Sequence, residues 1–235
     1  MFEVGGAGQH AFNSSARTFF RVLFRVKTHI RIEHLAPIPS TGPLILASNH
    51  ISHFDPPLVG AFFPRHVDWM AMEELFRNPR QARALELTGA FRVNRNGTDR
   101  TALRTATRRL KAGRVVGIFP EGGIRAGATS ILERAPMRPG LAALALLAEA
   151  PVIPSIIVGT DRLYHKRNWL PFRRPPVWIV TGALIPAEGE REALHERIAS
   201  AFVELQNHLL SQPGFRAEDL PLTPQARKGE DPYAP

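Results

Sequence analysis

The sequence predicts an α/β fold, a single domain in which helices flank a mostly parallel, mixed sheet. Short apolar runs of strand length alternate along the chain with longer amphipathic segments of helical period. Strands that alternate with helices in this way are typical of buried, mostly parallel sheets. The chain has 235 residues, of which 44% are hydrophobic, and these values suit one domain with a packed core.

The N-terminal part is expected to comprise a flexible segment, residues 1–14, and an amphipathic helix, residues 15–28. Three arginines of this helix recur every four residues and so share one face, while aliphatic and aromatic residues occupy the other. This pattern is typical of a helix in a membrane interface. A helix that packs its apolar face on the domain is the alternative. The expected membrane contacts are Arg17, Phe20, Arg21, Phe24 and Arg25.

Strands are expected where apolar or alternating runs end at turn residues. They lie at residues 28–34, 44–48, 66–72, 89–95, 114–123, 152–159 and 177–185. A helix starts at Asp55, because aspartate is favoured at a cap and proline in the first turn. The remaining helices are expected at residues 73–88, 99–111, 139–150 and 190–210.

The last of these helices is amphipathic and closes the main domain, residues 15–210. Its expected inner face carries Leu194, Ile198, Phe202, Leu205 and Leu209. The remaining segment, residues 211–235, is Pro-rich and charged, and we expect a mobile tail.

Composition limits the possible functions. The absence of cysteine excludes disulfides, thiolate zinc sites and thiol catalysis. The formal charge of +9 favours anionic partners, namely acidic lipid, phosphorylated small molecules or nucleic acid. The longest apolar stretch, residues 141–159, contains Glu149, Pro151 and Pro154, so we expect no transmembrane helix. No secretory signal is recognisable at the N-terminus.

The segment Ser48–Pro56, with the sequence SNHISHFDP, holds two histidines and an aspartate after a predicted strand. Its spacing does not fit the usual histidine patterns of metal sites, and we expect no metal. A purely structural role, with Asp55 capping a helix, is the default for such residues. It leaves unexplained why polar segments also follow the neighbouring strands, at Asn94-Arg95 and Glu121–Gly123.

A catalytic pair is the remaining interpretation of this segment. An aspartate that accepts a hydrogen bond from one imidazole nitrogen fixes the tautomer, and the other nitrogen can then take a proton from a hydroxyl. The chain has no cysteine and no G-x-S-x-G elbow, so no protein nucleophile is evident. The nucleophile is therefore expected to belong to the substrate.

Several blocks of the sequence resemble those of the glycerolipid acyltransferases, the lysophosphatidate and glycerol-3-phosphate acyltransferase family. NHISHFD resembles the NHxxxxD block, and GAFRVNR resembles a second block that ends in a basic residue. IFPEGGIRAG resembles the third block, usually written FPEGTRS, and APVIPSIIVG the fourth. The blocks occur in the family's order and the likeness covers roughly residues 15–210. The resemblance implies the glycerol-3-phosphate acyltransferase-like α/β fold.

The resemblance also implies roles for individual residues. His50 would be the general base and Asp55 the residue that orients it, with direct attack of the acceptor hydroxyl on an acyl thioester. No metal or bound cofactor is implied, since acyl-CoA or acyl carrier protein enters as substrate. The acceptor and its phosphate would be bound by Arg95, Glu121, Gly122, Gly123 and Arg125. A glycine loop that exposes N–H groups and an arginine both suit phosphate.

The third block departs from the family pattern, because Gly123-Ile124-Arg125 stands where Thr-Arg-Ser is usual. The displaced arginine leaves the acceptor open: lysophosphatidate is favoured, and glycerol 3-phosphate, an aminolipid or another lysolipid are alternatives. The expected partners are a lipid substrate and an acidic membrane surface, with acyl carrier protein as a partner if it, rather than acyl-CoA, is the donor. The expected location is peripheral, on the cytoplasmic face of a membrane. A non-catalytic lipid-binding protein and a nucleic-acid-binding protein are rivals, although no specific nucleic-acid binding is expected.

Overall fold

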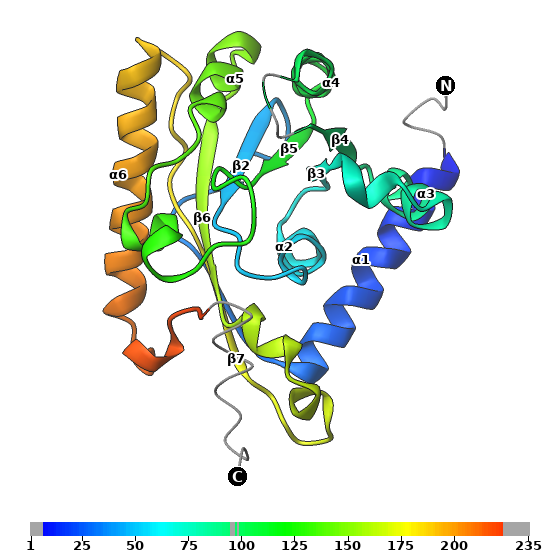
Figure 1. Ribbon diagram of the computed structural model, residues 1–235, viewed down its shortest axis with the longest axis vertical. Coiled ribbons are helices and arrows are strands. Elements are labelled where there is room, and N and C mark those ends of the chain that lie inside the picture. The colour runs from blue at the N-terminus through cyan, green and yellow to red at the C-terminus, as the bar shows by residue number, and fades with distance from the viewer. Residues whose placement is uncertain (1–6, 95–96, 98, 223–235) are drawn as a thin grey trace.

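The computed structural model describes residues 7–94, 97 and 99–222. Its centre is one seven-stranded sheet in the order β1-β7-β6-β2-β5-β3-β4 (Figure 1). The strands are β1 (His29–His34), β2 (Leu44–Ser48), β3 (Val67–Met72), β4 (Phe91–Val93), β5 (Val115–Ile118), β6 (Val152–Val158) and β7 (Pro176–Thr181). All neighbours are parallel except β6 and β7, which are antiparallel. The predicted mostly parallel, mixed sheet is confirmed.

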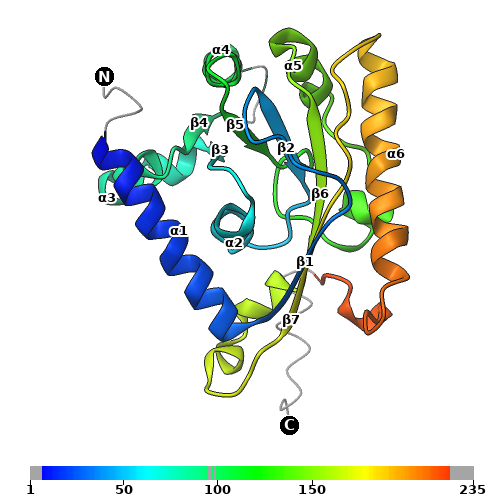
Figure 2. The same cartoon turned by 180° about the vertical axis from the view of Figure 1, so that it is seen from behind.

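Helices cover both faces of this sheet. They are α1 (Ala7–Lys27), α2 (Asp55–Phe62), α3 (Pro79–Leu87), α4 (Arg100–Lys111), α5 (Gly140–Ala148) and α6 (Arg191–Leu210). In Figures 1 and 2, α1 and α2 lie on one side of the strands β6 and β7, and α6 lies on the other side. The predicted α/β layer architecture is therefore confirmed.

The central strands β2 and β6 are largely apolar because both of their faces are buried. In β2, Ile45 and Ala47 face the core under α5 and α6, whereas Leu44 and Leu46 face the core under α2. All five residues of β2 are buried. Continuous apolar strands of this kind are expected where a parallel sheet is covered twice.

Helix α6 packs as the sequence predicts. Its five inner residues Leu194, Ile198, Phe202, Leu205 and Leu209 are all buried. The chain beyond α6 differs from the prediction in its first part, because residues 211–222 pack on the domain. Phe215 makes an edge contact with Trp178, and Asp219 pairs with Arg162 at 2.7 Å. Residues 223–235, the rest of the predicted mobile tail, lie outside the described residues.

Helix α1 is longer than predicted, because it begins at Ala7 inside the segment expected to be flexible. The sequence there lacks an apolar period, but Asn13 approaches His66 of the domain at 3.4 Å. A tertiary contact of this kind stabilises helix that local pattern alone does not predict. Residues 1–6 of the predicted flexible segment lie outside the described residues.

Candidate active site

His50 and Asp55 form a hydrogen-bonded pair where β2 ends and α2 begins. The distance between His50 Nδ1 and Asp55 Oδ2 is 2.8 Å. Asp55 is fully buried, and 15% of the His50 side chain is exposed. When Nδ1 donates to the carboxylate, the proton-accepting position of the neutral ring is Nε2. Nε2 has no hydrogen-bond partner among the described residues, so it is available to a substrate.

The Asp55 carboxylate is held by donors from two strand ends. Oδ2 also accepts the backbone N–H groups of Ile51 and Ser52, at 2.7 and 2.8 Å. Oδ1 accepts a hydrogen bond from the hydroxyl of Thr160, just beyond β6. A buried carboxylate is stabilised when its oxygens are satisfied by hydrogen bonds. These hydrogen bonds fix the Asp55 carboxylate in the orientation in which it binds Nδ1 of His50.

Gly159 brings Thr160 to this position. It has φ of +96°, and a Cβ atom there would overlap the carbonyl oxygen of Pro176. Only glycine adopts this conformation readily while allowing another backbone to approach so closely. The turn after β6 therefore depends on glycine and directs the Thr160 hydroxyl at Asp55.

Asn49 attaches the start of the catalytic loop to β6. Its amide nitrogen donates to the carbonyl of Ile157 at 2.9 Å, and its amide oxygen accepts from the N–H of the same residue at 2.7 Å. The side chain thus pairs with β6 much as a neighbouring strand would. This pairing fixes the backbone immediately before His50.

The imidazole of His50 lies on a stack of aromatic rings. It stacks on Phe119 with centroids 4.0 Å apart, and Phe119 stacks on Trp69 with centroids 4.6 Å apart. Trp69 in turn packs beside Gly117, where a Cβ atom would meet the indole. The stack and the Asp55 hydrogen bond together leave His50 little rotamer freedom, which is a requirement for a precisely oriented base.

Glu121 lies beside His50, and both of its carboxylate oxygens are occupied by the protein. Oε2 accepts the backbone N–H of His50 at 2.6 Å, and Oε1 accepts the Ser130 hydroxyl at 2.7 Å and the N–H of Ile131 at 2.9 Å. Burial raises the pKa of Glu121, and these hydrogen bonds oppose the rise. Glu121 thus ties the loop after β5 to the catalytic loop. Its predicted contact with the acceptor stays a prediction.

The glycine loop after β5 carries three further expected residues, Gly122, Gly123 and Arg125. The N–H of Arg125 donates to the carbonyl of His50 at 2.7 Å, and the Arg125 side chain is exposed. Gly122 has φ of +70°, and a Cβ atom there would overlap the guanidinium of Arg138. Gly123 follows in the same turn. The Arg125 backbone thus lies against His50, and the Arg138 guanidinium, which comes from the segment before α5, packs against the turn at Gly122.

Arg95, the other expected phosphate ligand, lies outside the described residues. Its neighbour Asn94 follows β4, and the Asn94 amide donates to Glu73 at 2.9 Å. His53 lies between the two residues of the pair and is exposed. The backbone N–H of His53 donates to the hydroxyl of Tyr164 at 2.9 Å, so Tyr164 fixes the loop from the β6 side.

The arginines of α1 are placed differently from their prediction as lipid contacts. Arg17 donates to the carbonyl of Phe63 at 2.6 Å, and Arg21 donates to that of Ala61 at 2.7 and 3.1 Å. Cations at the end of a helix satisfy its last carbonyls, and here the helix is α2. Arg25 lies over the ring of Phe62 at 5.6 Å.

Two of the expected lipid contacts are aromatic residues on this inner side of α1. Phe24 is buried in the core, and Phe20 packs against that core. The side of α1 that faces the domain is thus the arginine side, so the alternative in which the apolar face packs on the domain was wrong, whereas membrane contact by that face stays a prediction. The predicted lipid contacts are corrected accordingly, because these side chains hold α1 on α2. The solvent side of α1 is apolar.

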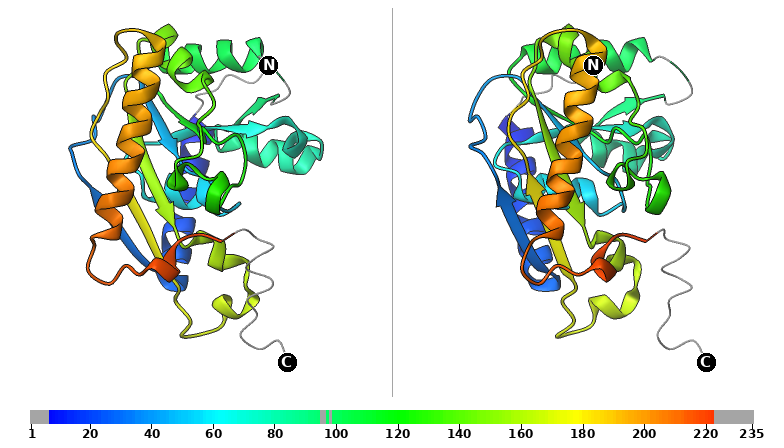
Figure 3. Two further views of the ribbon diagram at one scale, coloured as in Figure 1. Left: turned by 60° about the vertical axis from the view of Figure 1, so that its left-hand side comes forward. Right: turned by 90° about the vertical axis from the view of Figure 1, so that its left-hand side faces the viewer.

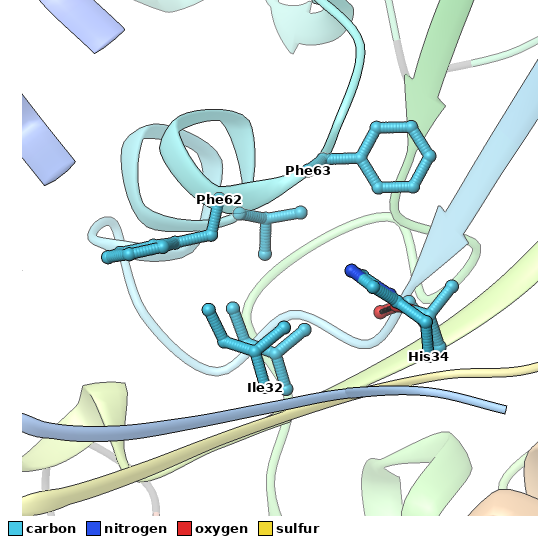
Figure 4. Close-up of a pocket in the computed structure, with 8 residues that line it drawn as sticks. Ile32, His34, Phe62 and Phe63 are labelled. Atoms are coloured by element: carbon cyan, nitrogen blue, oxygen red, sulfur yellow. Dashed lines mark hydrogen bonds between the residues drawn. The ribbon is translucent and has the colours of Figure 1, made fainter. Parts of the chain in front are cut away.

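A closed apolar seam lies at the far end of α2 from Asp55 (Figure 4). Phe62 and Phe63 at the end of the helix face Ile32 and His34 of β1 across it. No water-sized sphere fits inside, so the seam is closed to a fatty chain in this conformation. Partial burial lowers the pKa of His34 at its margin. The seam belongs to the packing of α2 on the sheet.

Most of the residues that support the pair were not predicted from the sequence. Thr160, Asn49, Phe119 and Tyr164 come from segments far apart in the chain. Asn49 precedes His50 directly, and Gly159-Thr160 follows a predicted strand, so a glycine and a hydroxyl at a strand end were the available signals. Among residues 7–94, 97 and 99–222, no group of three or more histidine, aspartate or glutamate side chains forms a metal-binding cluster.

Comparison with known proteins agrees with this geometry. A 1-acyl-sn-glycerol-3-phosphate acyltransferase of Bacillus subtilis is 25% identical over 193 residues, covering 80% of this chain and 94% of that protein. The crystal structure of the 1-acyl-sn-glycerophosphate acyltransferase PlsC from Thermotoga maritima has a similar fold, with a TM-score of 0.70 at 20% identity. The match covers 92% of this chain and 86% of that one. The Acyltransferase family pattern matches residues 29–158. Because this match spans more than half of the chain and contains both His50 and Asp55, the protein belongs to the acyltransferase family.

Proposed function

We propose that the protein transfers a fatty acyl group from acyl-CoA or acyl carrier protein to the hydroxyl of a lysophospholipid, with lysophosphatidate as the favoured acceptor and phosphatidate as the product. The observation that carries this proposal is the His50–Asp55 pair, at 2.8 Å with a fully buried carboxylate. The curated relative from Bacillus subtilis, named as an enzyme of this activity, supports the choice of acceptor.

The proposed mechanism is direct acyl transfer. His50 Nε2 takes the proton of the acceptor hydroxyl while the hydroxyl oxygen bonds to the thioester carbon. The tetrahedral oxyanion then collapses, the carbon–sulfur bond breaks, and the proton on His50 goes to the leaving thiolate. Asp55 stays ionised and stabilises the imidazolium that forms between the two steps. In the glycine loop, the N–H groups of Gly122 and Arg125 already donate to the carbonyls of Phe119 and His50, so the N–H groups of Gly123 and Ile124 are the ones proposed to stabilise the oxyanion or a phosphate.

The acceptor phosphate is proposed to lie near the loop that follows β5. Arg125 is exposed beside His50, and Arg138 lies over Gly122. Guanidinium groups bind phosphate through paired hydrogen bonds. Arg95, Gly122 and Gly123 complete the set that the family resemblance implies. Glycerol 3-phosphate, an aminolipid precursor and other lysolipids remain the alternative acceptors.

Attachment to the surface of a membrane is proposed to use the outer side of α1. Phe19, Val22 and Val26 are 61%, 57% and 60% exposed, and their spacing places them in one stripe. Phe172 is fully exposed beside Arg173 and Arg174. The Arg174 guanidinium donates to the carbonyl of Arg25, which ties this loop to the end of α1. Exposed apolar and aromatic side chains bordered by cations are typical of an interfacial contact.

No helix in the described part of the chain is long and apolar enough to cross a bilayer. Helix α1 is amphipathic, and we propose that it lies with its apolar stripe along the surface of an acidic membrane. By the expected location, this surface is the cytoplasmic face.

The test of the proposed function is thiol release from palmitoyl-CoA in the presence of lysophosphatidate, with the product identified by mass spectrometry. The expected result is acceptor-dependent release that falls by at least about a thousandfold in His50→Ala, the range for loss of a general base in such a pair. His53→Ala is the matched control, because the His53 side chain is exposed close to the pair and contacts the edge of the Tyr164 ring, while the loop is held by the His53 backbone N–H, which alanine keeps. Equal activity of His50→Ala and wild type would refute the role of His50. Release without acceptor would indicate a hydrolase.

A further inference from the structure

A broad groove runs along the outer side of α4, between this helix and the end of α5. Its volume is about 710 Å³. Four cations line one side of it, and two leucines and a threonine complete the lining. The residues are Arg100, Arg104, Arg108, Lys111, Leu103, Thr107 and Leu147. The cations lie four, four and three residues apart and therefore share one face of the helix.

The cations of the groove are exposed and make no ion pair with any carboxylate of the described residues. Arg109, on the inner side of the same helix, behaves differently. It is buried, lies over the ring of Phe91 and pairs with Asp68 at 3.4 Å. The helix thus uses one arginine for folding and leaves four basic side chains to solvent.

Helix stability does not explain this arrangement. Cations in the last turn, such as Arg108 and Lys111, suit the negative end of the helix dipole. Arg100 and Arg104 lie in the first half of α4, and Arg100 is its first residue, where the dipole disfavours a cation. Leu147 of α5 is 54% exposed at the border of the groove, without a partner element to cover it. An exposed basic row bordered by an uncovered leucine suits a partner that presents complementary negative charge with apolar residues between.

The position of the groove relates it to the catalytic edge. Helix α4 follows β4, whose carboxyl end lies on the same side of the parallel sheet as that of β2, where His50 lies. The amino end of α4 therefore opens toward the active-site edge. Figure 3 (left) shows α4 lying across the top of the molecule. In Figure 1, α4 and α5 lie at the top while the carboxyl end of α1 lies at the bottom.

We propose that this groove docks an acidic helix of an acyl carrier protein that delivers the acyl thioester to His50. The inference rests on the proposed function and selects the donor for it. From Arg100 to Lys111 the cations extend over about 16 Å of helix, which matches roughly three turns of a partner helix with carboxylates at the same spacing. The two leucines of the groove can pack against apolar side chains that lie between the carboxylates of the partner helix.

Other anionic partners fit the groove less well. The proposed lipid contact lies at the opposite end of the molecule, so the groove faces away from the bilayer and toward a soluble partner. Proteins that bind single-stranded nucleic acid combine cations with aromatic side chains on which bases stack, and the lining of this groove has no aromatic residue.

The test compares the charge reversal Arg104→Glu/Arg108→Glu with a matched control on α3, Arg80→Glu/Arg83→Glu. All four residues are exposed, and both double variants change the net charge equally. Binding of a fluorescein-labelled palmitoyl carrier protein is measured by anisotropy at low salt. The apparent KM is then measured for palmitoyl carrier protein and for palmitoyl-CoA as donors.

The expected result is a loss of carrier-protein affinity of at least tenfold in Arg104→Glu/Arg108→Glu, with less than a twofold loss in the control. The KM for the carrier-protein donor rises in parallel, and the KM for palmitoyl-CoA changes less than twofold. Unchanged binding, an equal loss in the control, or an equal effect on both donors would overturn the proposal. Failure of wild type to bind the carrier, or tighter binding of a labelled RNA at the same site, would also overturn it. If wild type binds the carrier but transfers no acyl group from either donor, the docking inference stands and the proposed function fails.

Discussion

Replacing Thr160 by valine removes one hydrogen bond from Asp55 and almost nothing else. Valine has nearly the same shape, so the packing after β6 is retained, but Oδ1 of a fully buried carboxylate loses the hydroxyl donor recorded for it. A hydrogen bond to a charged group contributes about 1.5–3 kcal/mol. For a domain of this size, each kcal/mol lowers Tm by about 2–4 °C, so we expect a fall of about 3–12 °C.

The same substitution is expected to reduce turnover, because Asp55 orients the imidazole of His50. If the lost hydrogen bond raises the activation free energy by about 1.4 kcal/mol, the rate falls about tenfold. The effect is expected in kcat rather than in KM, since Thr160 is buried behind Asp55 and does not touch a substrate. Steady-state kinetics with palmitoyl-CoA and thermal unfolding by circular dichroism measure both quantities.

Two further variants make this prediction decisive. Thr160→Ser keeps the hydroxyl and should restore most of the activity. Thr181→Val is the matched control. Thr181 is also buried, but its hydroxyl makes a long hydrogen bond of 3.4 Å to the hydroxyl of Ser155, which carries no charge. The reasoning is refuted if Thr160→Val retains wild-type kcat, or if it loses no more stability than Thr181→Val.

Three other predictions follow from the contacts described above. Burial raises the pKa of Glu121. The difference in unfolding free energy between wild type and Glu121→Gln should therefore be fully present below about pH 4.3, the ordinary glutamate value, and decline as the pH rises through the raised pKa. A difference between the urea midpoints of the two proteins that grows with pH would contradict this. Gly159→Ala should destabilise the fold by at least about 2 kcal/mol, because alanine is strained at positive φ and its Cβ overlaps a carbonyl oxygen; an unchanged urea midpoint would show that the turn is not constrained. The double variant Val22→Glu/Phe172→Glu should reduce co-sedimentation with vesicles of acidic phospholipid at least fivefold, while its Tm stays within about 2 °C of wild type because surface substitutions cost little stability. Leu210→Glu, at another exposed apolar position, should bind the vesicles as wild type does. Equal losses of binding in both variants would argue against a localised lipid contact.

The fold was predictable because its signals are local. Apolar runs such as Leu44–Ser48 and the inner stripe of α6 depend only on the period of neighbouring residues. The His50–Asp55 pair was predictable for the same reason, since five positions separate the two residues at a strand end. Their geometry did not require knowledge of the rest of the chain.

The surroundings of the pair depend on long-range contacts and could not be predicted in this way. Thr160 reaches Asp55 across 105 positions of the sequence. The wrong side of α1 was assigned to lipid because periodicity shows that two faces differ, but not which face packs. The carbonyls at the end of α2 decided the orientation, since they accept hydrogen bonds from Arg17 and Arg21.

The pairing of β1 with β7 has a consequence for the order in which the protein assembles. Residues 29–34 pair along their length with residues 176–181, near the end of the domain. During synthesis, the first strand must wait until almost the whole domain has left the ribosome, and loop closure over such a distance is slow. Helix α1 directly precedes this strand, so its final docking belongs to the late stages of folding. Under the proposed membrane contact of α1, this amphipathic helix would be free to reach a membrane surface before the domain is complete, so that attachment and folding would compete in time.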